Sequence, residues 1–264
     1  MCYETTARPP LPPISLREGL RPIHGGAATG ESVTLKASDG NEFAAFSAKA
    51  ESAGGPGIVI LPDVRGLHPF FEDLALRFAE AGVHATAFDY FGRTAGVARR
   101  DDDFDFWPEV MKTKPDTVSL DVAATADHLR SDDGGGATAI FTVGFCFGGR
   151  NSFNQAARGL GLAGVIGFYG SVVPRDESDT DAPIDKVSDF ECPVLGHFGG
   201  TDQMIPADGI EAFGKALDEV GVGNDLKIYE GAPHSFFDRA FEQFKAECDD
   251  AWTRMLEFIR ANSR

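Results

Sequence analysis

Short apolar runs alternate with longer amphipathic segments along most of the chain. The runs are bounded by Gly, Pro or Asp, which is typical of strands that are buried on both faces, and the segments between them have helical periodicity. The predicted strands cover residues 57–63, 83–91, 137–145, 163–170, 192–202 and 225–234, and the predicted helices cover 69–82, 116–130, 148–160, 208–221 and 241–260. This alternation predicts an α/β fold with a doubly wound, mostly parallel sheet and helices on both faces.

The N-terminal part of the chain lacks this alternation. Residues 1–30 hold five prolines and the stretch HGGAATG, a composition typical of an extended arm. Residues 31–50 form two strand-like runs on either side of Asp39-Gly40, a dipeptide typical of tight hairpins. The sequence therefore predicts a Pro/Gly-rich arm over residues 1–30 and a single domain over residues 31–264 that begins with an antiparallel hairpin.

One connection is longer than those usual in such folds. The segment Arg93–Pro115 follows a predicted strand and precedes a predicted helix. An insertion at the carboxyl end of a strand is either a binding loop or cap, or a mobile surface excursion. The sequence leaves both alternatives open.

Composition and charge narrow the classes of partner. The chain has 264 residues, 24 basic and 41 acidic, for a net charge of −17, so its surface would repel nucleic acid and anionic membranes. The N-terminus has no leader-like pattern, and the sequence contains no long apolar run, so we expect a cytoplasmic protein without membrane contact. The four cysteines include no CxxC pair and no metal-like spacing, so we expect no metal site.

Cys146 stands out from the other cysteines because of its neighbours. It lies in FTVGFCFGGRNSF, residues 141–153, where a predicted strand becomes a helix between glycines. The pattern Gly-x-Cys-x-Gly matches the nucleophile elbow Gly-x-Ser-x-Gly, in which glycines let strand and helix approach closely. A buried structural cysteine is the alternative, because small residues and cysteine are common at buried strand ends.

Two further polar residues follow predicted strands in the order nucleophile, acid, histidine. Asp202 comes after the apolar run PVLGHF, and His234 comes after LKIYE. Either could have a simpler role, Asp202 as a cap for the helix near Ala207 and His234 as an exposed loop residue. The carboxyl ends of parallel strands meet at one edge of the sheet, so we expect Cys146, Asp202 and His234 to meet there.

With the motifs GFCFGGR, GGTDQMIP and GAPHSFFD, the chain resembles the dienelactone hydrolase family, a branch of the α/β-hydrolases with a Cys-Asp-His triad. The resemblance extends from about Gly57 to the C-terminal helix. It implies an α/β-hydrolase sheet, a small ester or lactone substrate and no cofactor.

The same resemblance implies a role for each matching residue. Cys146 would be the nucleophile, His234 the acid and base, and Asp202 the group that orients the histidine. The backbone N–H groups of Val64 and Phe147 would form the oxyanion hole.

The resemblance is incomplete at two positions. The family's activating glutamate corresponds to Asp63 here, which is one methylene shorter and could instead cap the loop or pair with Arg65. The family's substrate-binding arginine, four residues after the histidine, corresponds to Asp238, and Arg239 comes one position later. This mismatch weakens the case for dienelactone itself as the substrate.

Other side chains near the motifs are candidates for contact with the substrate. A guanidinium group suits a carboxylate, and Arg65 and Arg93 are placed better than Arg99, Arg100 or Arg239. Aromatic residues next to the motifs, among them Tyr169 and Phe236, could form an apolar pocket.

The sequence thus predicts a hydrolase of small esters or lactones that acts through an acyl-enzyme on Cys146. Two alternatives remain: a thiol-dependent carboxylesterase or acyltransferase with other substrates, and a catalytically silent ligand-binding protein. The oligomeric state is open between monomer and dimer.

Overall fold

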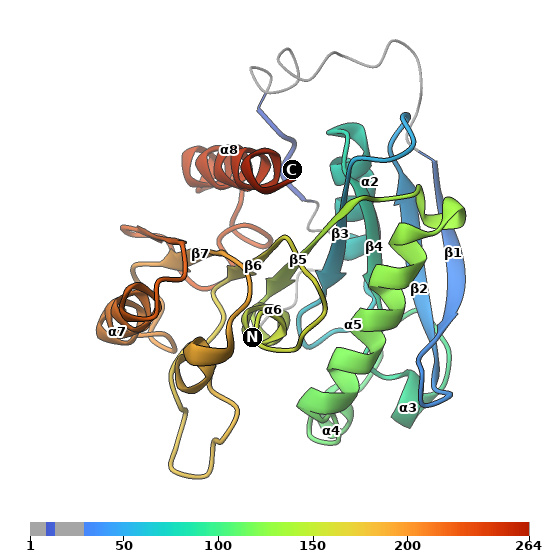
Figure 1. Ribbon diagram of the computed structural model, residues 1–264. Helices are drawn as coiled ribbons and strands as arrows, with labels where there is room; N and C mark the ends of the chain where they lie inside the picture. Colours follow the sequence, from blue (N-terminus) through green and yellow to red (C-terminus); the bar gives the residue numbers. More distant parts are fainter. Residues whose placement is uncertain (1–8, 14–28, 264) are drawn as a thin grey trace.

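The computed structural model describes residues 9–13 and 29–263, and this part of the chain contains one eight-stranded sheet (Figure 1). The strands are β1 Thr29–Lys36, β2 Glu42–Lys49, β3 Pro56–Leu61, β4 His84–Phe88, β5 Ala139–Phe145, β6 Gly164–Phe168, β7 Val194–Gly199 and β8 Asn224–Tyr229. Their order is β1-β2-β4-β3-β5-β6-β7-β8. The pairs β1/β2 and β2/β4 are antiparallel and the other pairs are parallel, so the predicted hairpin and mostly parallel sheet are confirmed.

Helices cover both faces of the sheet. The longer helices are α2 Pro69–Glu80, α5 Pro115–Arg130, α6 Phe147–Gln155, α7 Ala207–Glu219 and α8 Lys245–Asn262. On one face, α2 and α8 touch through the rings of Phe78 and Trp252, whose centroids are 4.9 Å apart. On the other, α6 and α7 touch through Phe153 and Phe213, and α5 lies beside α6 (Figure 1). The predicted α/β-hydrolase sheet with helices on both faces is therefore present.

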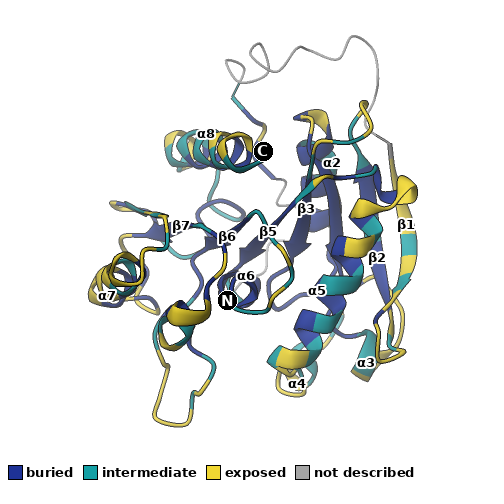
Figure 2. Ribbon diagram, in the orientation of Figure 1, coloured by how far each residue is buried: buried dark blue, intermediate teal, exposed yellow. Residues whose placement is uncertain are grey.

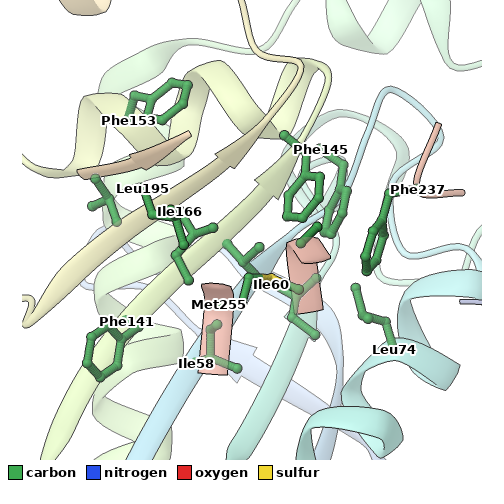
Figure 3. Packing of buried hydrophobic residues seen from close by; sticks show 14 of the residues in the cluster. Ile58, Ile60, Leu74, Phe141, Phe145, Phe153, Ile166, Leu195, Phe237 and Met255 are labelled. Carbon is green, nitrogen blue, oxygen red and sulfur yellow. The ribbon is translucent and has the colours of Figure 1, made fainter. Parts of the chain in front are cut away.

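Successive residues of the central strands face opposite layers of the core. Ile58 and Ile60 of β3 pack in the layer that contains α2 and α8, whereas Val59 and Leu61 pack against α5. Figure 3 shows the first layer, with Met255 of α8 beside the strand residues. The strands are buried on both faces in the middle of the sheet (Figure 2), which explains their continuous apolar runs in the sequence.

The insertion after β4 is folded onto the domain. It contains two short helices that the sequence did not predict, α3 Gly92–Ala95 and α4 Trp107–Val110. Arg100 binds buried Asp89 at 2.8 Å, and Asp102 accepts a hydrogen bond from His68 at 3.0 Å. The first contact attaches the insertion to the end of β4, and the second attaches it to the loop that connects β3 to α2.

Only part of the predicted arm lies within the described residues. Trp252 Nε1 donates a hydrogen bond to the Pro10 carbonyl at 2.9 Å, so residues 9–13 contact α8. Thr29 and Gly30, which were predicted in the arm, belong to β1. Residues 1–8 and 14–28 lie outside the described part. Among the helices described, none has the length and apolar character that a membrane span requires.

Candidate active site

Cys146 occupies a sharp turn between a strand and a helix. β5 ends at Phe145 and α6 begins at Phe147, and Cys146 between them has φ 55° and ψ −110°. A Cβ atom at Gly144 would lie 1.9 Å from the Gly148 carbonyl oxygen, so the turn can close only around glycine. The flanking glycines thus permit the strained backbone that presents Cys146.

The loop after β3 passes next to this turn. A Cβ atom at Gly148 would lie 2.1 Å from the Leu61 carbonyl oxygen and 2.3 Å from that of Pro62. Residues 62–65 therefore run alongside the first turn of α6. This contact brings Asp63 and Val64 to the same edge of the sheet as Cys146.

The cysteines differ in their exposure. Cys146 is partly exposed, whereas Cys192 and Cys248 are buried. Burial raises the pKa of the Cys192 thiol to about 12 and also raises that of Cys248. These two thiols therefore stay protonated and unreactive at neutral pH. Cys146 also lies at the N-terminus of α6, where the helix dipole favours a thiolate.

Asp202 and His234 form a hydrogen-bonded pair. His234 Nδ1 donates to Asp202 Oδ2 at 2.6 Å, and the other carboxylate oxygen accepts from the Met204 backbone N–H at 2.9 Å. The N-cap of α7 is Pro206, so Asp202 is not the helix cap considered as its alternative role. The carboxylate is only 2 % exposed, and it fixes both the tautomer and the orientation of the imidazole.

The second imidazole nitrogen of His234 is oriented away from Asp202. Nε2 is buried and has no hydrogen-bond partner among the described residues, although the His234 side chain is 14 % exposed. An exposed loop histidine, the alternative from the sequence, does not fit this burial. A buried nitrogen without a partner is available for a proton from a nucleophile or a substrate.

Tyr169 lies against His234. It directly follows β6 with φ 38°, and its ring centroid is 4.9 Å from that of His234. Burial, followed by the negative charges of Asp238, Asp63 and Cys146, raises the pKa of the phenol well above its ordinary value. The loops after β3, β5, β6 and β8 therefore converge around this hydroxyl group.

Asp63 is held by Arg65. The guanidinium Nη2 lies 2.7 Å from Asp63 Oδ2, and Arg65 Nε donates to the same oxygen at 2.9 Å. The ion pair expected as the alternative role of Asp63 is thus present. Its role in activating the nucleophile stays a prediction.

A second carboxylate, Asp238, faces the same guanidinium. Its Oδ2 lies 3.8 Å from Arg65 Nη2, and its Oδ1 lies 3.6 Å from Arg239 Nε. Arg239 also donates to the Ser235 hydroxyl at 2.7 Å. Burial, together with the negative charge of Asp63, raises the pKa of Asp238 to about 6. We call Asp63, Arg65, Asp238 and Arg239 the charged cluster.

The sequence did not assign Asp238 to the site, although its position four residues after His234 was the available clue.

Two residues predicted as candidates for substrate contact, Arg93 and Phe236, have other partners in the structure. Arg93 pairs with Asp39 and Asp121, near the β1–β2 hairpin and α5. Phe236 is fully buried and packs on Tyr169 and Tyr229 as part of the core.

A cavity of about 540 Å³ opens beside Phe147. Its walls come from the start of α6, the end of the insertion and the loop after β6, and include Val110, Met111, Phe147, Arg150, Asn151 and Asp179. The volume lies in the range of small-molecule sites. Within the residues described, no group of three or more His, Cys, Asp or Glu side chains could hold a metal ion.

Comparison with known proteins identifies relatives for almost the whole domain. The model of the dienelactone hydrolase family matches residues 43–263. A Yersinia pestis protein provisionally named carboxymethylenebutenolidase is 30 % identical over 227 residues, which cover 84 % of this chain and 85 % of that protein. A Bradyrhizobium protein is 26 % identical over 78 % of this chain and 83 % of its own length; its provisional name is 2-oxo-3-(5-oxofuran-2-ylidene)propanoate lactonase. A Klebsiella pneumoniae structure, provisionally titled dienelactone hydrolase, has a TM-score of 0.78 at 25 % identity and covers 89 % of this chain and 99 % of that one.

Proposed function

Because this chain belongs to the dienelactone hydrolase family, we propose that it hydrolyses small esters and lactones through Cys146, with His234 as acid and base and Asp202 as the orienting carboxylate. The observation that carries the proposal is the 2.6 Å hydrogen bond between His234 and Asp202 at the sheet edge where the strained turn presents Cys146. A protein that only bound ligands would not need this pair.

The first half of the reaction forms an acyl-enzyme. His234 Nε2 accepts the thiol proton, and Cys146 Sγ attacks the carbonyl carbon. Negative charge develops on the carbonyl oxygen, where the backbone N–H groups of Phe147 and Val64 would stabilise it. The carbon–oxygen bond of the ester then breaks, and the leaving oxygen takes the proton from the imidazolium.

The second half releases the acid. Water gives a proton to His234 and attacks the thioester carbonyl, and the thiolate leaves and recovers its proton from the imidazolium. For a lactone, the alcohol formed in the first half stays attached to the acid product. Asp202 stabilises the imidazolium at both steps without taking up its proton.

The relatives' names support lactones as a substrate class, and the cavity supports small esters in general. Phe147, the residue after Cys146, lines that cavity, so the acyl or alcohol group of a substrate bound to Cys146 can extend into it. A carboxylesterase acting on simple esters is the second candidate, favoured by the engagement of Arg65 with Asp63. Initial rates on a dienelactone and on phenyl acetate would separate the two candidates.

Removal of either reactive side chain tests the mechanism. We expect Cys146→Ala and His234→Ala each to lower kcat for aryl acetates by about a thousandfold or more, because the two groups act as a unit. Cys192→Ala is the matched control, since it removes a thiol that the proposal does not use, and it should retain activity. The proposal fails if both active-site variants keep substantial turnover while folded by circular dichroism.

A further inference from the structure

We propose that Asp238 sets the charge preference of the active site: by binding the two nearby guanidinium groups, it favours uncharged esters and lactones over substrates that carry a carboxylate. The inference rests on the proposed function, since it concerns the substrates of that site. It concerns the charged cluster, which comes from the loop after β3 and from the segment that follows His234.

Both arginines of the charged cluster are already paired with carboxylates. Arg65 is 7 % exposed and lies between Asp63, at 2.7 Å, and Asp238, at 3.8 Å. Arg239 has Asp238 at 3.6 Å and donates to the Ser235 hydroxyl at 2.7 Å. A substrate carboxylate would have to displace Asp238 from these partners before it could bind a guanidinium group.

The two ion pairs of Asp238 are longer than hydrogen bonds. Its side chain is 1 % exposed, and Oδ2 has no hydrogen-bond partner within the described residues. A second anion nearby is therefore not screened by solvent, and the repulsion between the two is strong at low dielectric. The phenol of Tyr169 feels the charges of Asp238, Asp63 and Cys146 together, so the cluster acts at the place where the substrate reacts.

Alkylation of Cys146 measures this preference without any turnover. Iodoacetamide and iodoacetate react with a thiolate by the same displacement of iodide, and they differ by one carboxylate. The rate constant for iodoacetamide is divided by that for iodoacetate, and this ratio is divided by the same ratio measured with N-acetylcysteine. The resulting normalised ratio reports the electrostatic preference of the site. Peptide mass spectrometry assigns the reaction to Cys146.

We expect this normalised ratio to exceed about ten in the wild-type protein at pH 8, and to fall at least about fivefold in Asp238→Asn. The amide keeps the shape of the side chain and removes its negative charge, whereas Arg65 and Arg239 keep their positive charges. Asp225→Asn is the matched control: it makes the same chemical change at an ion pair with Arg254 on the surface, and it should leave the ratio unchanged. Equal ratios in wild type and Asp238→Asn, or a wild-type preference for iodoacetate, would overturn the inference.

The pH dependence of the same ratio tests the idea in the unaltered protein. The groups that face Asp238 are Asp63 and Arg65 from the loop after β3, Tyr169 from the loop after β6, Arg239 from its own segment and Cys248 from α8. The thiolate fraction cancels in the ratio, and iodoacetate stays ionised above pH 5. The ratio should therefore decrease as Asp238 is protonated near pH 6, and a flat ratio from pH 8 to pH 5 contradicts the proposal.

Hydrolysis of 4-acetoxybenzamide and 4-acetoxybenzoate extends the test to substrates. We expect kcat/KM, divided by the rate constant for hydroxide-catalysed hydrolysis of the same ester, to be higher for 4-acetoxybenzamide than for 4-acetoxybenzoate. In Asp238→Asn the difference between the two esters should be smaller. Equal selectivity in the two proteins would count against the role of Asp238, whereas full activity of Cys146→Ala would count against the proposed hydrolase mechanism alone. The two failures are thus distinguishable.

Discussion

At the scale of single residues, backbone strain marks the site. Among the described residues other than glycine, Cys146, Tyr169 and Ser235 have positive φ angles of 55°, 38° and 60°. Each follows a different strand of the sheet, and Tyr169 and Ser235 lie beside His234. Such conformations cost about 1–3 kcal/mol each and persist where the surroundings determine them, as they do at many active sites. The strained positions are thus the proposed nucleophile, the tyrosine whose ring lies 4.9 Å from that of His234, and the residue next to His234 in the chain.

The carboxylate of Asp202 provides a test at this scale. Asp202→Asn keeps the size of the side chain but removes the acceptor that holds the proton on His234 Nδ1, so the imidazole can adopt the wrong tautomer. We expect kcat for phenyl acetate to fall by about 10³–10⁴-fold with little change in KM. Steady-state kinetics measure this, with Asp208→Asn in α7 as the control. A loss below tenfold would mean that His234 does not depend on Asp202.

At the scale of elements, topology explains why residues distant in the sequence meet. Cys146 follows β5, Tyr169 follows β6, Asp202 follows β7 and His234 follows β8, and these strands are neighbours in the sheet and parallel. Their carboxyl ends therefore form one edge, and the loops that leave them converge. The site is thus a consequence of strand order, with the loop after β3 adding Asp63 and Arg65.

The strands and the proposed triad could be predicted because their clues are local. Apolar runs bounded by glycine predict buried strands, and Gly-x-Cys-x-Gly predicts a tight turn, and both patterns are read from neighbouring residues alone. The charged cluster and the attachment of the insertion could not be predicted in the same way. Arg100 finds Asp89 and Arg65 finds Asp238 only after folding, and Arg93 looked suitable for substrate although it pairs with Asp121. Nothing in the surrounding sequence distinguishes a paired arginine from an available one.

The attachment of the insertion can be tested at one ion pair. Arg100 holds the carboxylate of Asp89, which is fully buried and whose pKa is raised by burial. Arg100→Met keeps much of the apolar stem but leaves Asp89 without its charged partner, so we expect a loss of about 3–5 kcal/mol in the free energy of unfolding.

Urea denaturation measures this loss. Arg99→Met is the matched control, because the Arg99 side chain is 53 % exposed where it binds Glu72, and its removal should cost less than about 1 kcal/mol. Similar losses in the two variants would show that the buried pair does not hold the insertion.

At the scale of the whole molecule, buried ionisable groups give opposing contributions to stability in acid. His197 is fully buried in β7, and burial lowers its pKa to about 3. The folded protein therefore binds fewer protons at this group than the unfolded chain does, so acid favours unfolding. Burial raises the pKa of Asp121 and Asp238 to about 6, and those carboxyl groups favour the folded state as the pH falls below that value. The acid stability of the protein is the balance of these contributions.

His197 is the group whose contribution can be removed cleanly. Its Nδ1 donates to the Tyr229 hydroxyl at 3.1 Å, while that hydroxyl donates to Asp250 at 3.0 Å, and the ring stacks on Phe168 at 4.4 Å. His197→Phe keeps the stacked ring and leaves Tyr229 bonded to Asp250, but it removes the titration. Any initial cost of the substitution is the same at every pH, so the pH dependence of the difference from wild type isolates the protonation of His197.

We expect the stability of His197→Phe relative to wild type to rise by about 2 kcal/mol between pH 7 and pH 5, because the unfolded wild-type chain binds a proton below about pH 6.5 that the folded protein excludes. Urea titrations at several pH values measure this difference, and subtraction of the wild-type curve cancels the contributions of Asp121, Asp238 and the net charge. Tyr229→Phe is the control, since it breaks the same hydrogen bond but leaves His197 able to titrate; its difference from wild type should stay nearly constant. If the free energies of unfolding of His197→Phe and wild type have the same pH dependence, the folded protein admits a proton at His197. The buried imidazole would then not contribute to unfolding in acid.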